Sequence, residues 1–155
     1  MLRETLPADI EPLCALSEKT AIFYDFEIAM LREVLDDYFT DREPGHVCRT
    51  WEDGQIRGFI YYAPVEMTDQ TWEIWWLVVD PDSQGQGLGK KMMAEAERDL
   101  KRKGTRLLLV ETSSIPRYEP THHFYRKIGY IEAARIPDFY VEGDDKIIFW
   151  KKLTQ

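Results

Sequence analysis

The feature that most constrains the fold is a glycine-rich segment that separates an apolar stretch from a helical pattern. The apolar stretch, residues 74–79, reads IWWLVV, and the glycine-rich segment, residues 84–91, reads QGQGLGKK. Gly104 is a typical helix stop. From the end of the glycine-rich segment to Gly104, apolar residues recur at helical spacing, and they are Leu88, Met92, Ala96 and Leu100. The pattern predicts a buried strand, a glycine loop and a helix in succession.

This succession predicts a binding site for an anion, most often a phosphate. The first N–H groups of a helix have no partner inside the helix, and the helix dipole places partial positive charge there. Glycines let a ligand approach the backbone closely. Two familiar phosphate motifs do not match. A dinucleotide fingerprint would need glycine in place of Lys90. A P-loop would need glycine in place of Gln84 and Ser or Thr in place of Lys91.

The segment does match the pattern Gln-x-x-Gly-x-Gly, through Gln84, Gly87 and Gly89. With the strand before it and the helix after it, this motif resembles the acyl-coenzyme A pyrophosphate signature of the GNAT superfamily of N-acetyltransferases. The resemblance implies that the loop binds the pyrophosphate of acetyl-coenzyme A (acetyl-CoA). The residues implied are Gln84, Gly85, Gln86, Gly87, Leu88, Gly89 and Lys90. The alternative is a glycine-rich turn that merely joins strand to helix.

The whole chain predicts the order strand, two helices, three strands, helix, strand, helix, two strands. The expected strands are residues 1–6, 46–51, 56–65, 71–79, 106–112, 130–135 and 146–152, with 137–145 as a long connection between the last two. We expect an α+β fold of three layers, with a mixed sheet of about seven strands and about four helices. A single domain over residues 1–155 is expected from the length.

This order is also that of the acyl-CoA N-acyltransferase fold. The resemblance implies that strands 4 and 5, residues 71–79 and 106–112, are parallel and splay apart. It further implies that the pantetheine arm of acetyl-CoA enters the gap and contacts the main chain of Leu77, Val78 and Val79.

A second motif, residues 124–130, reads FYRKIGY and resembles the segment that closes the cofactor site in this superfamily. The resemblance implies that Tyr125 contacts acetyl-CoA and acts as general acid. When an amine attacks the thioester the leaving group is a thiolate, and a phenol with a pKa of about 10 stays protonated to serve it. The alternative is a packing role for Tyr125.

The chain departs from the superfamily pattern at Tyr118, where many members carry an asparagine that contacts the cofactor. Thr121 is a predicted helix cap that could replace part of the asparagine contact.

A proton acceptor is also needed, because an alkyl amine is mostly protonated at pH 7. Its pKa is near that of the lysine side chain, about 10.4. Glu73, on the strand before the loop, is the first candidate base. Trp72 and Trp75 would partly desolvate it and raise its pKa. Glu111, at the end of the second splayed strand, is the other candidate. His122 is expected to face solvent at the start of a helix.

Composition narrows the partners. The formal net charge of −8 and the lack of a basic patch argue against nucleic acid and suit a cationic amine. No run approaches the about 18 apolar residues of a membrane helix, and the first residues do not read as a signal peptide, so a cytoplasmic protein without a membrane partner is expected. Cys14 and Cys48 lack metal-ligand spacing and are expected in the core. Glu97 is expected on an ordinary charged helix face.

Together these features predict an acetyl-CoA-dependent N-acetyltransferase that moves an acetyl group directly to a primary amine of a small molecule or peptide. Acetyl-CoA would be the cosubstrate, and no metal is expected. The alternatives are a non-catalytic acyl-CoA-binding sensor and an interaction module with the same fold. The sequence leaves the acceptor and the oligomeric state open, a homodimer included.

Overall fold

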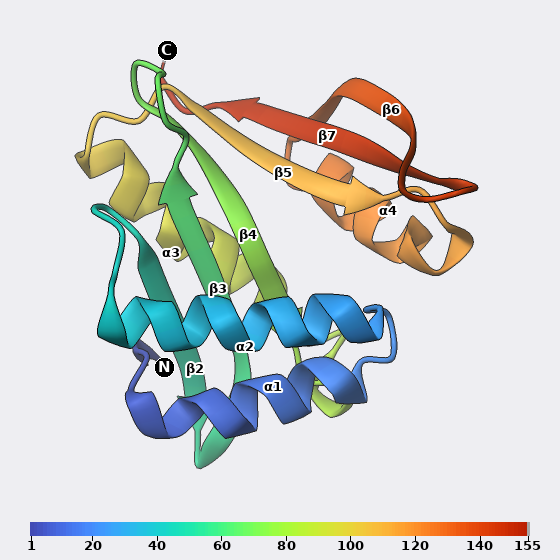
Figure 1. Cartoon of the computed structure of the whole chain (residues 1–155). Coiled ribbons are helices and arrows are strands. Elements are labelled where there is room, and N and C mark those ends of the chain that lie inside the picture. Colours follow the sequence, from blue (N-terminus) through green and yellow to red (C-terminus); the bar gives the residue numbers. More distant parts are fainter. Residues whose placement is uncertain (155) are drawn as a thin grey trace. The chain divides into compact units, whose positions relative to one another are not determined.

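The computed structural model describes residues 1–154, which form one seven-stranded mixed sheet in the order β1-β2-β3-β4-β5-β7-β6 (Figure 1). The strands are β1 (Leu2–Glu4), β2 (Val47–Asp53), β3 (Gln55–Pro64), β4 (Thr71–Val79), β5 (Leu107–Ser113), β6 (Ile131–Val141) and β7 (Asp144–Lys152). The helices are α1 (Ile10–Lys19), α2 (Asp25–Thr40), α3 (Leu88–Arg102) and α4 (Glu119–Lys127). The predicted α+β fold is confirmed. Within residues 1–154, none of these helices is long and apolar enough to cross a membrane.

The chain divides into two compact units. The first contains Met1–Ala63 and Trp76–Ala96, and the second contains Pro64–Trp75 and the chain from Glu97 onward. The chain therefore passes between the units three times: at the end of β3, within β4 and within α3.

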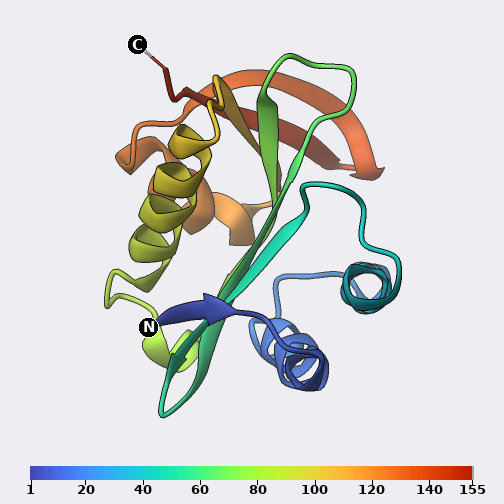
Figure 2. The same ribbon diagram turned by 90° about the vertical axis from the view of Figure 1, so that its left-hand side faces the viewer.

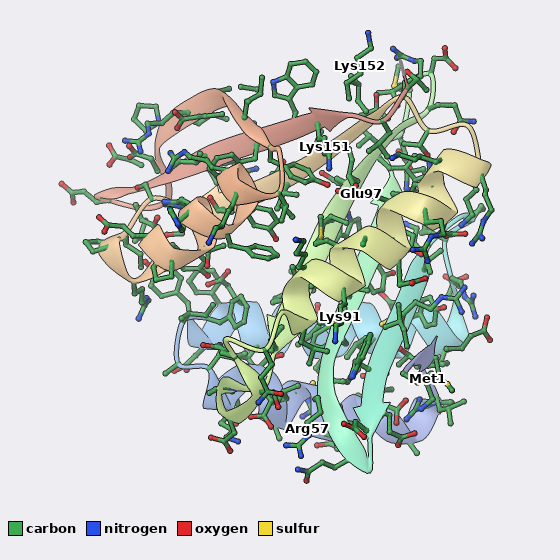
Figure 3. The ribbon with its side chains drawn as sticks, turned by 180° about the vertical axis from the view of Figure 1, so that it is seen from behind. Met1, Arg57, Lys91, Glu97, Lys151 and Lys152 are labelled. Atoms are coloured by element: carbon green, nitrogen blue, oxygen red, sulfur yellow. The ribbon has the colours of Figure 1, made fainter. Side chains whose placement is uncertain are left out.

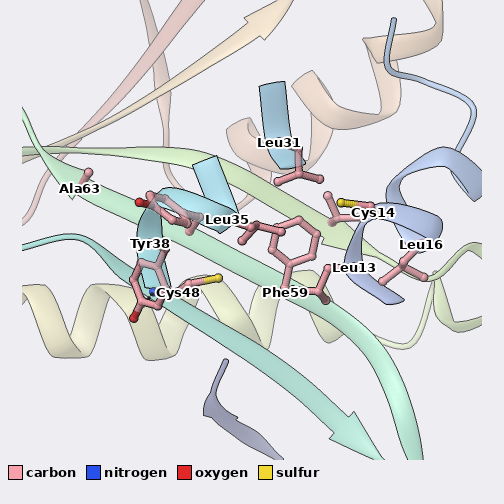
Figure 4. Close-up of a cluster of buried hydrophobic side chains, with 11 residues drawn as sticks. Leu13, Cys14, Leu16, Leu31, Leu35, Tyr38, Cys48, Phe59 and Ala63 are labelled. Atoms are coloured by element: carbon pink, nitrogen blue, oxygen red, sulfur yellow. Dashed lines mark hydrogen bonds between the residues drawn. The ribbon is translucent and has the colours of Figure 1, made fainter. Parts of the chain in front are cut away.

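In the first unit, α1 and α2 cover one face of the strands, and the first part of α3 lies on the opposite face (Figure 2). Leu31, Leu35 and Tyr38 of α2 recur at helical spacing, and this stripe is buried. Figure 4 shows the resulting cluster, whose buried members are Leu13, Cys14, Leu16, Leu31, Leu35, Tyr38, Cys48, Phe59, Tyr61, Ala63 and Val78. Both cysteines are therefore core residues, as predicted.

On the α3 face, Gly58 of β3 permits close packing. A Cβ added there would lie 2.6 Å from the carbonyl oxygen of Val78 and 3.0 Å from Cε of Met92. The Val78 contact is with backbone of β4, which cannot give way as the end of the Met92 side chain can, so a larger residue at Gly58 would disturb the packing of β3 and β4.

In the second unit, β5 is the central strand. It pairs in parallel with the first part of β4, from Thr71↔Leu107 to Ile74↔Val110. On its other side it pairs antiparallel with β7, from Leu107↔Lys152 to Ser113↔Lys146. The parallel pairing predicted for strands 4 and 5 is confirmed.

The prediction of a long connection over residues 137–145 is wrong. Strand β6 continues to Val141, and a short turn at Gly143, with φ of +84°, leads into β7. Asp138 stabilises the irregular part of the hairpin: its amide donates to the Asp145 carboxylate at 2.9 Å, and its own carboxylate accepts from the amide of Gly143 at 2.8 Å. Pro137 is tolerated within the strand because β6 is an edge strand.

The helix α4 begins earlier than predicted, at Glu119, with Pro120 in its first turn. Tyr118 is therefore at the N-cap position, and Thr121 lies inside the helix and does not cap it. The prediction for His122 is also wrong. It is buried, and its Nε2 lies 2.7 Å from the carbonyl oxygen of Ser113. His122 shares a helix face with Tyr125, and that face packs on Phe149.

Candidate active site

The glycine loop of the first unit connects a short 3-10 turn, Pro81–Ser83, to the start of α3. Gly85 and Gly87 have φ values of +80° and +75°, which residues with a side chain rarely adopt. A Cβ added at either glycine would meet no atom within 4 Å, so the space beside the loop is open. The amide of Lys91 donates to the carbonyl oxygen of Gly87 at 3.0 Å, where the helical hydrogen bonds begin. The preceding amides belong to the first turn, and this arrangement fits a bound anion.

The residues flanking the loop are held by local contacts. The Gln84 side chain donates through Nε2 to the carbonyl oxygen of Val79 at 3.5 Å, which ties the loop to the end of β4. In β4, Val78 is buried, and Leu77 and Val79 are half-buried. Lys91 lies with its Nζ 6.0 Å from the ring centre of Trp51. The ligand contacts predicted for these residues, and for Lys90, remain predictions.

Tyr125 lies in the second unit and is 3% exposed. Its ring contacts those of Phe124, Tyr130 and Phe149, with centroids 5.1, 5.6 and 6.0 Å away. Burial raises the pKa of the Tyr125 phenol above its ordinary value, so it is protonated at neutral pH. Within residues 1–154 no hydrogen bond to its hydroxyl is found. The hydroxyl is therefore available to donate a proton.

The structure brings the two candidate bases together in the second unit. Oε1 of Glu73 accepts from Nε1 of Trp75 at 2.9 Å, whereas Oε2 of Glu111 pairs with Nζ of Lys146 at 2.8 Å. Burial raises the pKa of Glu73; the Trp75 hydrogen bond opposes this, the charge of Glu111 adds to it, and Lys146 opposes it. Glu73 thus has a neutral hydrogen-bond donor and a raised pKa, while Glu111 has a cation as its partner.

The candidate base and acid lie on opposite faces of the strands in this unit. Side chains alternate along a strand, so Glu111, opposite Ile148, points away from the face of Val110 and Phe149. Glu73 pairs with Leu109 and shares the Glu111 face, whereas Tyr125 packs on Phe149. A substrate that meets both groups must therefore reach them beyond the last residue pair of the β4–β5 ladder, Ile74↔Val110.

Sequence reasoning missed a polar network beside Tyr125. Glu97 was expected on a solvated helix face, but its side chain is only 12% exposed. It accepts from the Tyr130 hydroxyl at 2.8 Å and from Nζ of Lys151 at 3.0 and 3.1 Å. Lys151 also donates to the carbonyl oxygen of Ile128 at 3.0 Å. Figure 3 labels Glu97 on α3 and Lys151 on β7. The network fixes Tyr130, whose ring contacts Tyr125. No local pattern around Glu97 signals this burial.

The comparisons with known proteins agree with this geometry. Residues 11–130 match the model of the acetyltransferase (GNAT) family. A crystal structure from Desulfovibrio desulfuricans that is assigned to GNAT acetyltransferases is 32% identical, with 99% of each chain covered and a TM-score of 0.93. No curated protein sequence matches the chain.

Two more distant structures share the fold. A Salmonella typhimurium protein, assigned as an acetyltransferase and solved with its cofactor acetyl-CoA, is 16% identical, with 100% of this chain and 94% of that chain covered and a TM-score of 0.80. An aminoglycoside 6′-N-acetyltransferase complexed with coenzyme A is 17% identical, with 100% and 98% covered and a TM-score of 0.77. From the family match and the fold together, the chain belongs to the GNAT family of acetyltransferases, which use acetyl-CoA.

Proposed function

We propose that this protein is an N-acetyltransferase that moves the acetyl group of acetyl-CoA directly to a primary amine of a small molecule or peptide. The observation that carries the proposal is the loop before α3. Two glycines in left-handed conformations, Gly85 and Gly87, border open space at the first turn of a helix. Membership of the GNAT family supports acetyl-CoA as the anion that this loop accepts.

The roles of the binding residues follow from the loop. Backbone N–H groups from Gln84 to Lys90 bind the pyrophosphate, because the helix dipole favours negative charge there. The main chain of Leu77, Val78 and Val79 binds the pantetheine arm. Acetyl-CoA, when bound, supplies an acetyl group activated as a thioester.

The proton-transfer roles belong to the second unit. Tyr125 gives a proton to the departing thiolate, since its buried phenol is protonated and unpaired within residues 1–154. Glu73 takes the proton of the amine, because its raised pKa and neutral Trp75 partner make it the better acceptor. Glu111 is the second candidate, and its carboxylate lies in an ion pair with Lys146.

The test is a turnover assay with acetyl-CoA and a panel of small amines and peptides, read by the released thiol, together with calorimetry of coenzyme A binding. We expect binding and amine-dependent thiol release with at least one acceptor. Binding without turnover on any amine would favour the acyl-CoA sensor over the enzyme. Failure to bind coenzyme A would refute both.

A further inference from the structure

A charged cluster immediately precedes the glycine loop in the first unit. Nζ of Lys19, the last residue of α1, lies 2.7 Å from Oδ1 of Asp80 and 2.7 Å from Oδ2 of Asp82. Asp80 is 5% exposed. Its Oδ2 also lies 3.5 Å from a guanidinium nitrogen of Arg57 in β3, a residue labelled in Figure 3. One lysine of α1 thus bonds two carboxylates on either side of Pro81.

The Asp80 carboxylate caps the turn before the loop. Oδ1 of Asp80 accepts from the amide of Asp82 at 3.2 Å, and the carbonyl oxygen of Asp80 accepts from the amide of Ser83 at 2.8 Å. The amide of Gln84, where the loop begins, then donates to the carbonyl oxygen of Pro81 at 3.4 Å. These bonds together hold the turn that connects the Lys19 contacts to the first loop residue.

The loop itself has little to hold it, because Gly85 and Gly87 lack side chains and glycine has the largest backbone freedom. Its conformation therefore depends on its two ends. One end is the first turn of α3, and the other is the turn that Lys19 holds. An unanchored loop would lose conformational entropy on binding a ligand, which weakens affinity.

The cluster also has an electrostatic consequence. Two carboxylates beside a site for pyrophosphate would repel it, and Lys19 and Arg57 supply two compensating positive charges. The Lys19 hydrogen bond holds the pKa of Asp80 below its ordinary value, so the carboxylate is ionised and the pair persists at neutral pH.

We propose that Lys19 is a positioning residue for the loop: through Asp80 and Asp82 it fixes the loop for the phosphates of coenzyme A and cancels the acidic charge beside them. This inference rests on the proposed function of the loop. It assigns a role in phosphate binding to a helix that contains none of the family motif residues.

The decisive variant is Lys19→Met, which keeps the aliphatic part of the side chain and removes the charge. We expect its Kd for coenzyme A to rise about fivefold, as for an ion pair between a buried and a half-exposed group. Lys19→Arg should restore most of the affinity. The matched control is Arg32→Met, which removes the exposed pair of Arg32 with Glu11 between α2 and α1 and does not touch the turn.

A donor comparison separates positioning from general stability. The KM for acetyl-CoA should rise in Lys19→Met, while the KM for S-acetylpantetheine, which has no pyrophosphate, should not change. Because KM does not depend on the fraction of folded enzyme, this readout holds even if Lys19→Met lowers Tm. An equal rise for both donors, or a parent-like Kd for coenzyme A, would overturn the proposal and leave the proposed function standing. If the parent protein itself binds no coenzyme A, the proposed function and this inference both fail.

Discussion

Replacing Lys151 with methionine should destabilise the protein, because it leaves Glu97 in a desolvated place without its cation. Lys151 donates to both carboxylate oxygens of Glu97 and to the carbonyl oxygen of Ile128. After the change, Glu97 keeps only the hydrogen bond from the Tyr130 hydroxyl among the bonds of this network. The carboxylate must then stay buried with its charge uncompensated or open the network to water.

The magnitude follows from burial. Breaking a fully buried ion pair costs about 3–5 kcal/mol, whereas an exposed pair contributes less than about 1 kcal/mol. The Lys151 and Glu97 side chains are 27% and 12% exposed, which lies between these limits but nearer the buried one. We expect a loss of about 2 kcal/mol in the free energy of unfolding, or about 4–8 °C in Tm for a domain of this size.

Thermal and urea unfolding of Lys151→Met measure this loss. Lys152→Met is the matched control: Lys152 is the next residue on β7, it is exposed, and we expect a change within about 0.5 kcal/mol. The double variant Lys151→Met/Glu97→Gln should recover part of the loss, since glutamine leaves no buried charge. If Lys151→Met unfolds within about 1 °C of the parent, Glu97 is not desolvated as described and the reasoning is wrong.

Three further changes test the candidate site. Gly87→Val places a side chain in the open space beside the loop and should raise the Kd for coenzyme A at least about tenfold, measured by calorimetry. The control is Gly54→Val, at a similar φ in the β2–β3 turn, and it should bind coenzyme A with the parent's affinity. Equal affinities in the two would reject the loop as the binding site. Tyr125→Phe should lower kcat about 10²-fold with little change in Kd for acetyl-CoA, and parent-like turnover would reduce Tyr125 to a packing residue. Because the pKa of Glu73 is raised, the rate should fall as pH drops through that pKa, and Glu73→Gln should lose both rate and this acidic limb. The rate deficit of Glu73→Gln should shrink as pH approaches the pKa of the amine. If Glu111→Gln loses the rate and the acidic limb while Glu73→Gln keeps both, Glu111 on β5 is the base.

The sequence by itself determined the elements whose signals are local. The apolar run before Asp80, the glycines at 85 and 87 and the helical spacing of Leu88 and Met92 each lie within a few residues of one another. They predicted β4, the loop and α3 because backbone conformation there depends on neighbouring residues. Leu31, Leu35 and Tyr38 are another local signal, because their helical spacing matches the buried stripe of α2. The motif residues of the loop also identified the family.

Local signals failed where a distant partner changes the outcome. Residues 137–145 were expected to form a long connection, but pairing with β7 and the Asp145 carboxylate extend β6 to Val141. His122 was expected in solvent, but the carbonyl of Ser113 provides a buried partner for its imidazole. In both places a contact from another element satisfied a polar group that the sequence alone would leave to water.

Only the tertiary structure decided the chemical environment of the candidate acid and base. Glu73 and Glu111 are both plausible in sequence, and they differ because Trp75 supplies a neutral donor to one while Lys146, on β7, supplies a cation to the other. Tyr125 is desolvated because α4 packs on Phe149. A proton affinity depends on desolvation and on charges within a few ångströms, and strand pairing sets both between residues that are far apart in the sequence.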